Sequence, residues 1–259
     1  MTNNVYGIDL GTCNMKIYCK ASNKIMNEKN TIALVNKNEM YAYGDDAYAM
    51  YEKAPETIVA VPTDITDVEK RAFFDMFYKS KLKPKSVLLC EKPIADAVGL
   101  GLNVNEPTGI MVVDIGADTT EISVISLGGL VLSDLLHSGG NKIDESIITY
   151  VKRKYNLVIG QKTAQSMKET LGSGIPGNTQ TMVVVGRDVV SGLPIEMEMS
   201  GAVVYEAIKD NLNTICNSIK MILEKTPPEL ARDIIHSGIY ITGGSSQIHD
   251  LDQLFRDIT

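Results

Sequence analysis

The chain has 259 residues, of which 44% are apolar, and this is enough for two compact lobes or one large domain with a real core. The formal net charge is -7 and Lys and Arg form no block, so binding to a nucleic-acid backbone is not expected. No basic start with a following apolar run and no long apolar stretch occurs, so we expect a cytoplasmic protein without a signal peptide or spanning helix.

The first predicted element is a β-hairpin at Val5–Lys20, which contains the sequence YGIDLGTCNMKIYC. The Ala and Tyr spacing within Tyr41–Ile58 suits a short helix that ends before a proline. Thr66 and Glu69 have the spacing of a capping box, which predicts a helix at Asp67–Lys81. Strand, turn and helix in this order indicate an α/β fold.

A second strand and helix complete the first half. Ser86–Cys90 is predicted as a buried strand, and Pro93 suits the first turn of a helix at Ile94–Leu102. The linker NVNEPTG then divides the chain into two expected lobes, 1–107 and 108–259.

The second half repeats this plan and then adds helices. We expect a hairpin at Ile110–Leu127, a strand at Leu130–Leu135, helices at Ile143–Tyr155 and Thr163–Leu171, two strands joined by a Gly-Leu-Pro turn, a long helix at Gly201–Lys225, a short helix in ELARDII, and a strand, glycine turn and helix in GIYITGGSSQIHDL. The long helix has the spacing of one buried face at Val204, Ile208, Leu212, Ile215, Ile219 and Ile222.

The two hairpins echo each other. In VVDIGADTTEISVI, Asp114 aligns with Asp9 and Gly116 with Gly11, so the copies lie 105 residues apart (114 minus 9). Each copy supplies a carboxylate, which can hold magnesium through water, and a glycine turn, which lets backbone amides approach a phosphate. One such pattern is common in ordinary hairpins, but two copies predict that the hairpins face each other and bind one triphosphate.

A third element has paired glycines. In ITGGSS, Ile241–Ser246, an apolar strand runs into two glycines and then a helix, which allows backbone to lie flat against a base or phosphate.

Together these motifs resemble the superfamily of actin, sugar kinases and heat-shock chaperone ATPases. Within it, VPTDITDVEKRA, TGIMVVDIG, SGGNKIDESIITYVKRKY, TPPELARDI and ITGGSSQIHDLDQL resemble the MreB-type bacterial actins, from Val5 to Leu254. The resemblance implies a duplicated actin-like (ribonuclease H-like) α/β fold, with two lobes around a cleft that binds ATP and magnesium. It also implies polymerisation and a role in cell shape, with partners that are the chain itself or a related actin-like protein in filaments, and membrane proteins of cell-shape determination.

The resemblance also assigns site residues. The implied set is Asp9 and Asp114 for magnesium, through water; Gly11, Thr12, Cys13 and Asn14 in the first turn; Gly116, Ala117, Asp118 and Thr119 in the second; Lys168, which matches the family's nucleoside-binding Lys, with Glu169 beside it and Gln165 in the same helix; and Gly243, Gly244, Ser245 and Ser246 in the loop that binds adenosine in the family. Asp9, Asp114 and Lys92 form the implied catalytic set.

The chain departs from this family in its chemistry. Lys92 stands where the family has the Glu that positions the attacking water, so we expect weak ATP hydrolysis. Ala117 and Asp118 replace two glycines, which adds a Cβ and an anion near the phosphates. Asp118 either points outward or weakens binding.

Two departures concern length. The family has a strand, a helix and the start of another strand between the positions of Ile58 and Val59, so the first lobe is expected to be shortened. The family also continues beyond the position of Thr259 with a segment that returns to the first lobe. The apolar loop that inserts into membranes in some relatives would lie in the first gap, so we expect no direct membrane binding.

Three functions remain open at this point. The first is an ATP-binding filament protein, and the second is a non-hydrolysing module that caps or joins filaments of a complete relative. The third is a small-molecule kinase, which would need an Asp base and a substrate pocket in the first lobe.

Overall fold

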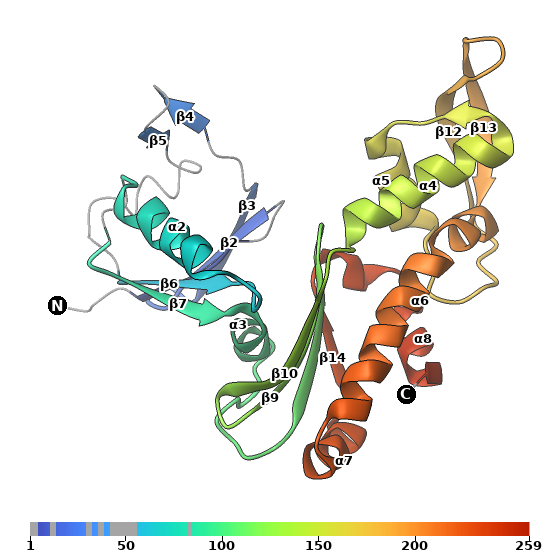
Figure 1. Ribbon diagram of the computed structural model, residues 1–259. Coiled ribbons are helices and arrows are strands. Elements are labelled where there is room, and N and C mark those ends of the chain that lie inside the picture. The colour runs from blue at the N-terminus through green and yellow to red at the C-terminus, as the bar shows by residue number, and fades with distance from the viewer. Residues whose placement is uncertain are drawn as a thin grey trace. The chain divides into compact units, whose positions relative to one another are not determined.

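The computed structural model describes residues 5–10, 14–29, 33–35, 39–41, 56–81 and 84–258. The chain divides into two compact units, Met1–Val104 and Asn105–Thr259, each with its own sheet and core (Figure 1).

The first unit contains a five-stranded sheet in the order β3-β2-β1-β6-β7. Strands β1, β2 and β3 are antiparallel, whereas β6 and β7 extend the sheet in parallel to β1. The strands are β1 (Val5–Leu10), β2 (Asn14–Cys19), β3 (Lys24–Lys29), β6 (Glu56–Val61) and β7 (Ser86–Glu91), and β4 (Ala33–Val35) pairs with β5 (Glu39–Tyr41) separately.

Two helices follow the parallel strands of this unit. Helix α2 (Asp67–Tyr78) begins with the predicted capping box, in which the Glu69 amide donates to Thr66 Oγ1 and the Thr66 amide donates to Glu69 Oε2. Helix α3 (Lys92–Gly99) begins two residues earlier than predicted, so Lys92 is its first residue. The short helix expected within Tyr41–Ile58 falls on residues outside the described ranges.

The second unit repeats the sheet pattern of the first. Its sheet has the order β10-β9-β8-β14, in which the first three strands are antiparallel and β14 is parallel to β8. The strands are β8 (Ile110–Ile115), β9 (Thr120–Ser126), β10 (Gly129–Leu136) and β14 (Ile239–Thr242). Strand β8 lies 105 residues after β1 at both of its ends, so the duplicated α/β fold expected from the echo is confirmed.

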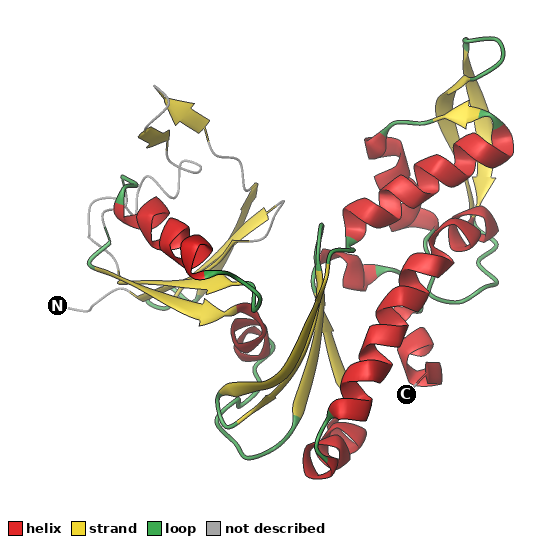
Figure 2. Cartoon of the chain, viewed as in Figure 1, coloured by secondary structure: helices red, strands yellow, loops and turns green. Residues whose placement is uncertain are grey.

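Helices complete the second unit, and α6 packs on β9, β10 and α4 (Figure 2). The remaining elements are α4 (Gly140–Tyr155), β11 (Leu157–Val158), α5 (Gln161–Leu171), β12 (Thr181–Asp188), β13 (Pro194–Ser200), α6 (Gly201–Lys225), α7 (Pro228–Ser237), the 3-10 helix η2 (Gly244–Gln247) and α8 (Leu251–Ile258). All six predicted apolar positions of α6 are buried, so this helix supplies a large part of the unit's core.

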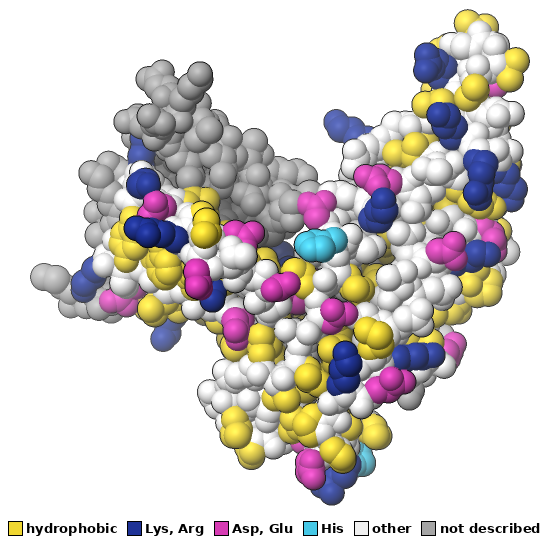
Figure 3. Space-filling model, in the orientation of Figure 1, with side chains coloured by type: hydrophobic (Ala, Val, Ile, Leu, Met, Phe, Trp, Pro, Cys, Tyr) yellow, Lys and Arg dark blue, Asp and Glu magenta, His cyan; other side chains and the backbone are white. Residues whose placement is uncertain are grey.

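The β12–β13 hairpin exposes apolar side chains. Figure 3 shows hydrophobic atoms at its tip, where Val190 and Leu193 are 84% and 63% exposed. Val183 and Val185 on β12 are also exposed, opposite Glu198 and Glu196 of β13. Both strands and the turn between them were predicted, but this exposed apolar surface was not.

Candidate functional site

The turn between β8 and β9 is the centre of the candidate site. The Gly116 amide donates to the Thr119 carbonyl over 2.9 Å, which closes the turn. The amides of Ala117 and Asp118 donate to no acceptor in the part of the chain that the structure describes. Asp114 precedes the turn at the end of β8 and is 3% exposed. The turn therefore offers two backbone donors beside a buried carboxylate, which suits a phosphate with its metal ion.

The N-terminus of α4 holds this turn in place. The Gly140 amide donates to the Gly116 carbonyl over 2.9 Å, and the Asn141 amide donates to the Ala117 carbonyl over 2.7 Å. A Cβ at Gly139 would lie 2.6 Å from the Ala117 carbonyl oxygen, so the close approach requires glycine. The sequence SGGN carried this signal, but glycines alone did not identify the partner segment.

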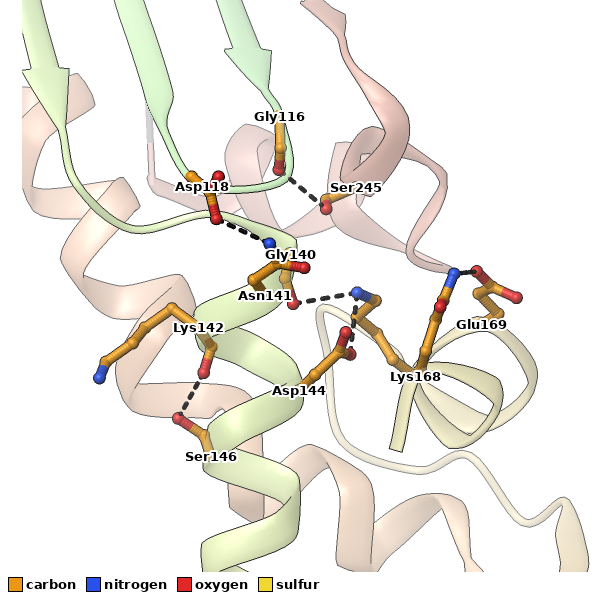
Figure 4. A network of polar contacts seen from close by, with 11 residues as sticks. Gly116, Asp118, Gly140, Asn141, Lys142, Asp144, Ser146, Lys168, Glu169 and Ser245 are labelled. Atoms are coloured by element: carbon orange, nitrogen blue, oxygen red, sulfur yellow. Dashed lines mark hydrogen bonds and ion pairs between the residues drawn. The ribbon is translucent and has the colours of Figure 1, made fainter. Parts of the chain in front are cut away.

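Asp118 is bound to the same helix. Its side chain is exposed, and its Oδ1 accepts a hydrogen bond of 2.7 Å from Asn141 Nδ2 (Figure 4). The carboxylate is thus directed toward α4, and its charge is partly offset by the amide donor.

The glycine loop after β14 lies against the same turn. Gly243 has φ of 88°, and a Cβ there would collide with the Asp114 carboxylate and the Ile115 carbonyl. Ser245 is buried and its Oγ donates to the Gly116 carbonyl over 3.3 Å, while Ser246 Oγ donates to the Gly243 carbonyl over 2.7 Å. The structure therefore brings the second turn and the glycine loop together, although they are separated by more than 120 residues.

Gly244 differs from its neighbour. It is exposed, and a Cβ built on it would meet no atom within 4 Å. Packing within the protein therefore does not require glycine at this position. The absence of a side chain leaves the backbone of Gly244 accessible to the flat face of a ligand.

Helix α5 carries the other predicted nucleoside residues. Lys168 Nζ lies 2.9 Å from Asp144 Oδ1 and donates to the Gly140 carbonyl over 3.0 Å, and both side chains are buried (Figure 4). Burial raises the pKa of Asp144, while the Lys168 ammonium beside it acts in the opposite direction. Gln165 and Glu169 are exposed and joined by a hydrogen bond of 2.8 Å.

In the first unit, the predicted site residues Asp9 and Lys92 both lie at the carboxyl ends of parallel strands. Asp9, Ala60 and Cys90 form one row across β1, β6 and β7, and Lys92 follows at the start of α3. Lys16 Nζ lies 4.0 Å from Asp9 Oδ2.

The rest of the first turn is less fully described. Gly11, Thr12 and Cys13 lie outside the described residues, and Asn14 is placed only as the first residue of β2. Their nucleotide contacts, and the facing of the two hairpins, stay predictions.

Two properties of the described residues bear on metal and membrane binding. No three His, Cys, Asp or Glu side chains gather there in a way that would hold a metal ion, so a resident metal would need water or phosphate oxygens as further ligands. Within the same residues, none of the helices combines the length and the apolar character needed to cross a membrane.

The sequence is similar to a known protein family and to proteins of named function. The family described as MreB/Mbl protein matches residues 3–61 and 53–259. The cell shape-determining protein Mbl of Bacillus subtilis is 35% identical, over 97% of this chain and 87% of the relative. The cell shape-determining protein MreB of Escherichia coli K12 is 33% identical, over 100% of this chain and 88% of the relative.

The alignments are longer than the chain. They extend over 293 and 306 positions, so at least 34 and 47 positions of these relatives (293 minus 259 and 306 minus 259) have no counterpart in this chain. The two family matches overlap at residues 53–61, which supports a shortening in the first unit.

Solved structures agree with the sequence relatives. The crystal structure of MreB5 of Spiroplasma citri bound to AMPPNP has a TM-score of 0.85 and 30% identity, over 100% of this chain and 90% of that one. The ADP-bound structure of MreB5 has a TM-score of 0.87. The MamK double helical filament, with a TM-score of 0.75 at 19% identity, shows the same actin-like fold.

Proposed function

The chain belongs to the MreB/Mbl family, and we propose that it is an actin-like cytoskeletal protein that binds ATP with magnesium, polymerises and takes part in determining cell shape. The names of its relatives support the role in cell shape, and the AMPPNP and ADP complexes of MreB5 support nucleotide binding. The MamK filament has the same fold and is compatible with self-association.

One observation carries the nucleotide proposal. The amides of Ala117 and Asp118 donate to no acceptor among the described residues, in a turn framed by Asp114 and by the glycine loop. Backbone amides in such a turn bind phosphate oxygens, and a buried carboxylate beside them suits a hydrated magnesium ion. The residues present therefore fit a magnesium–triphosphate.

Each part of the site then has a proposed role. The Ala117 and Asp118 amides hold phosphates, and Asp114 holds magnesium through water. Gly243 and Gly244 present flat backbone to the nucleoside, and the exposed α5 residues Gln165 and Glu169 lie on the helix that borders it. Bound magnesium would neutralise part of the charge on the phosphates. From the resemblance, Asp9, Thr12 and Asn14 contact the same triphosphate.

We propose further that hydrolysis is slow and that partners are filament subunits and membrane proteins of cell-shape determination. Lys92, half-buried at the start of α3, is a cation where the family has a carboxylate. A cation does not accept a proton from the attacking water at neutral pH.

Two measurements on the 259-residue protein test this function. Titration with ATP in the presence of magnesium measures affinity, and sedimentation with and without ATP measures polymerisation. Saturable ATP binding with ATP-dependent pelleting is expected. Binding without pelleting would indicate a monomeric module instead, and turnover that depends on added sugar would indicate a kinase. Absence of ATP binding would contradict the proposal.

A further inference from the structure

A buried ion pair adjoins the turn but is not itself part of it. Lys168 Nζ and Asp144 Oδ1 lie 2.9 Å apart, and their side chains are only 10% and 4% exposed. By contrast, Lys142 and Glu145 on the same helix as Asp144 form a pair whose side chains are 59% and 61% exposed. Burying a charge pair gives little net stability relative to apolar residues of similar size. The role of this ion pair is therefore to hold the neighbouring backbone in place rather than to add stability.

The pair fixes the first turn of α4. Lys168 Nζ donates to the Gly140 carbonyl over 3.0 Å, and the amide of the same Gly140 donates to the Gly116 carbonyl over 2.9 Å. One peptide segment thus connects the ammonium to the phosphate-binding turn. A Cβ at Gly140 would lie 2.5 Å from Ser245 Oγ and 3.1 Å from Lys168 Nζ, so α4, α5 and η2 meet closely at this glycine (Figure 4).

The geometry also bears on whether Lys168 contacts the nucleoside. The Lys168 ammonium donates a hydrogen bond to the Gly140 carbonyl and lies 2.9 Å from Asp144 Oδ1, so both of these contacts are with the protein. The side chain is 10% exposed, whereas Gln165 and Glu169 on the same helix are exposed. Lys168 therefore points into the protein, and its neighbours on α5 are better placed to meet a ligand.

We propose that Lys168 and Asp144 are positioning residues, which hold the first turn of α4 so that Gly140 and Asn141 keep the Gly116–Asp118 turn in its phosphate-binding shape. This inference rests on the proposed nucleotide binding. It assigns Lys168 a different role from the nucleoside contact that the resemblance implies, because Lys168 acts through Gly140 rather than on the ligand.

Amide hydrogen exchange measured by NMR on the protein without nucleotide tests the positioning directly. In Lys168→Met and in Asp144→Asn, the Gly140 and Asn141 amides should exchange about tenfold faster or more, because the bonds to the turn are loosened. Amides in the middle of α6 should be unchanged. Lys142→Met and Glu145→Gln serve as matched controls on an exposed pair, and they should exchange as the wild type does. Unchanged exchange at Gly140 and Asn141 in folded variants would overturn the inference.

Binding of ATP and of inorganic tripolyphosphate, which has no nucleoside, separates the two roles of Lys168. If Lys168 has a positioning role, both single variants should lower the affinity for ATP and the affinity for tripolyphosphate by a similar factor, about tenfold or more. A loss of ATP affinity in Lys168→Met with unchanged tripolyphosphate affinity would instead show a nucleoside contact and overturn the inference.

Each single variant leaves one buried charge without its partner and risks misfolding. The double variant Lys168→Met with Asp144→Leu removes both charges of this pair and should fold, yet bind tripolyphosphate as weakly as the single variants. Wild-type affinity in this folded double variant would overturn the inference. Failure of the wild-type protein to bind ATP would overturn the proposed function instead, and the exchange measurement would then judge the positioning role alone.

Discussion

Asp9 and Asp114 occupy equivalent positions in the two units, but Asp9 faces a cation across its hairpin whereas Asp114 faces an anion. Asp9 lies opposite Lys16 in the β1–β2 ladder, and Asp114 lies opposite Glu121 in the β8–β9 ladder. Asp114 and Glu121 are 3% and 2% exposed, and like charges directly opposite each other on a sheet repel. The second hairpin therefore places two carboxylates side by side where the first hairpin pairs a carboxylate with an ammonium.

This relationship predicts that Asp114→Ala weakens ATP binding in magnesium by more than about tenfold, because a carboxylate near the metal is lost. Titration in magnesium and in EDTA measures the effect. The difference between variant and wild type should disappear in EDTA if the carboxylate acts through the metal. Asp252→Ala removes an exposed carboxylate on α8 and should leave the affinity unchanged. An unchanged affinity in Asp114→Ala would contradict the magnesium role.

The adjacent glycines of the β14–η2 loop should respond differently to alanine. Gly243→Ala should lower the free energy of unfolding by about 2 kcal/mol or more, because φ is 88° and the new Cβ meets Asp114 and Ile115. Gly244→Ala meets no protein atom, so its stability should change by less than about 0.5 kcal/mol. Its ATP affinity should nevertheless fall, because the Cβ occupies the proposed ligand surface. Urea unfolding and ATP titration check both, and equal stability of the two variants would contradict this assignment.

Local signals predicted much of the fold. Helix α6 spans Gly201–Lys225 as predicted, because its apolar period is regular and prolines follow it. The Thr66–Glu69 capping box formed as predicted, because both of its bonds lie within one turn. The similar sequences of the two hairpins predicted the antiparallel pairs β1–β2 and β8–β9, whereas strand β3 at Lys24–Lys29 lies in a polar segment that was not predicted as a strand.

The contacts that shape the candidate site were not predicted. Gly140 meets Gly116, 24 residues away (140 minus 116), and Lys168, 28 residues away. A glycine in a sequence indicates that backbone comes close to something, but not to which segment. The Lys168–Asp144 pair had no signal either, since both residue types are usually exposed and the burial arises only when α4 and α5 pack together.

Lys92→Glu should raise ATP turnover if the rest of the site is intact. A residue that orients or deprotonates the attacking water contributes roughly 10²–10⁴-fold, and the wild type has a cation at this position, the first residue of α3. Phosphate release in magnesium measures the rate. Lys70→Glu on α2 makes the same charge change at an exposed position and should have no effect. A wild-type rate as fast as that of a complete relative would refute the expectation, and unchanged turnover in Lys92→Glu would show that another feature limits the reaction.

The protein should not bind anionic membranes by itself. The apolar face of α6 is buried in the core, and a net charge of -7 opposes association with anionic lipid. The exposed apolar surface of the β12–β13 hairpin is flanked by Glu196 and Glu198 as well as by Arg187, so it lacks the predominantly basic rim that an interfacial anchor favours. In co-sedimentation with anionic vesicles at low salt, the protein should remain in the supernatant. Pelleting that Val190→Asp with Leu193→Asp abolishes would contradict this and identify the hairpin tip as the membrane contact.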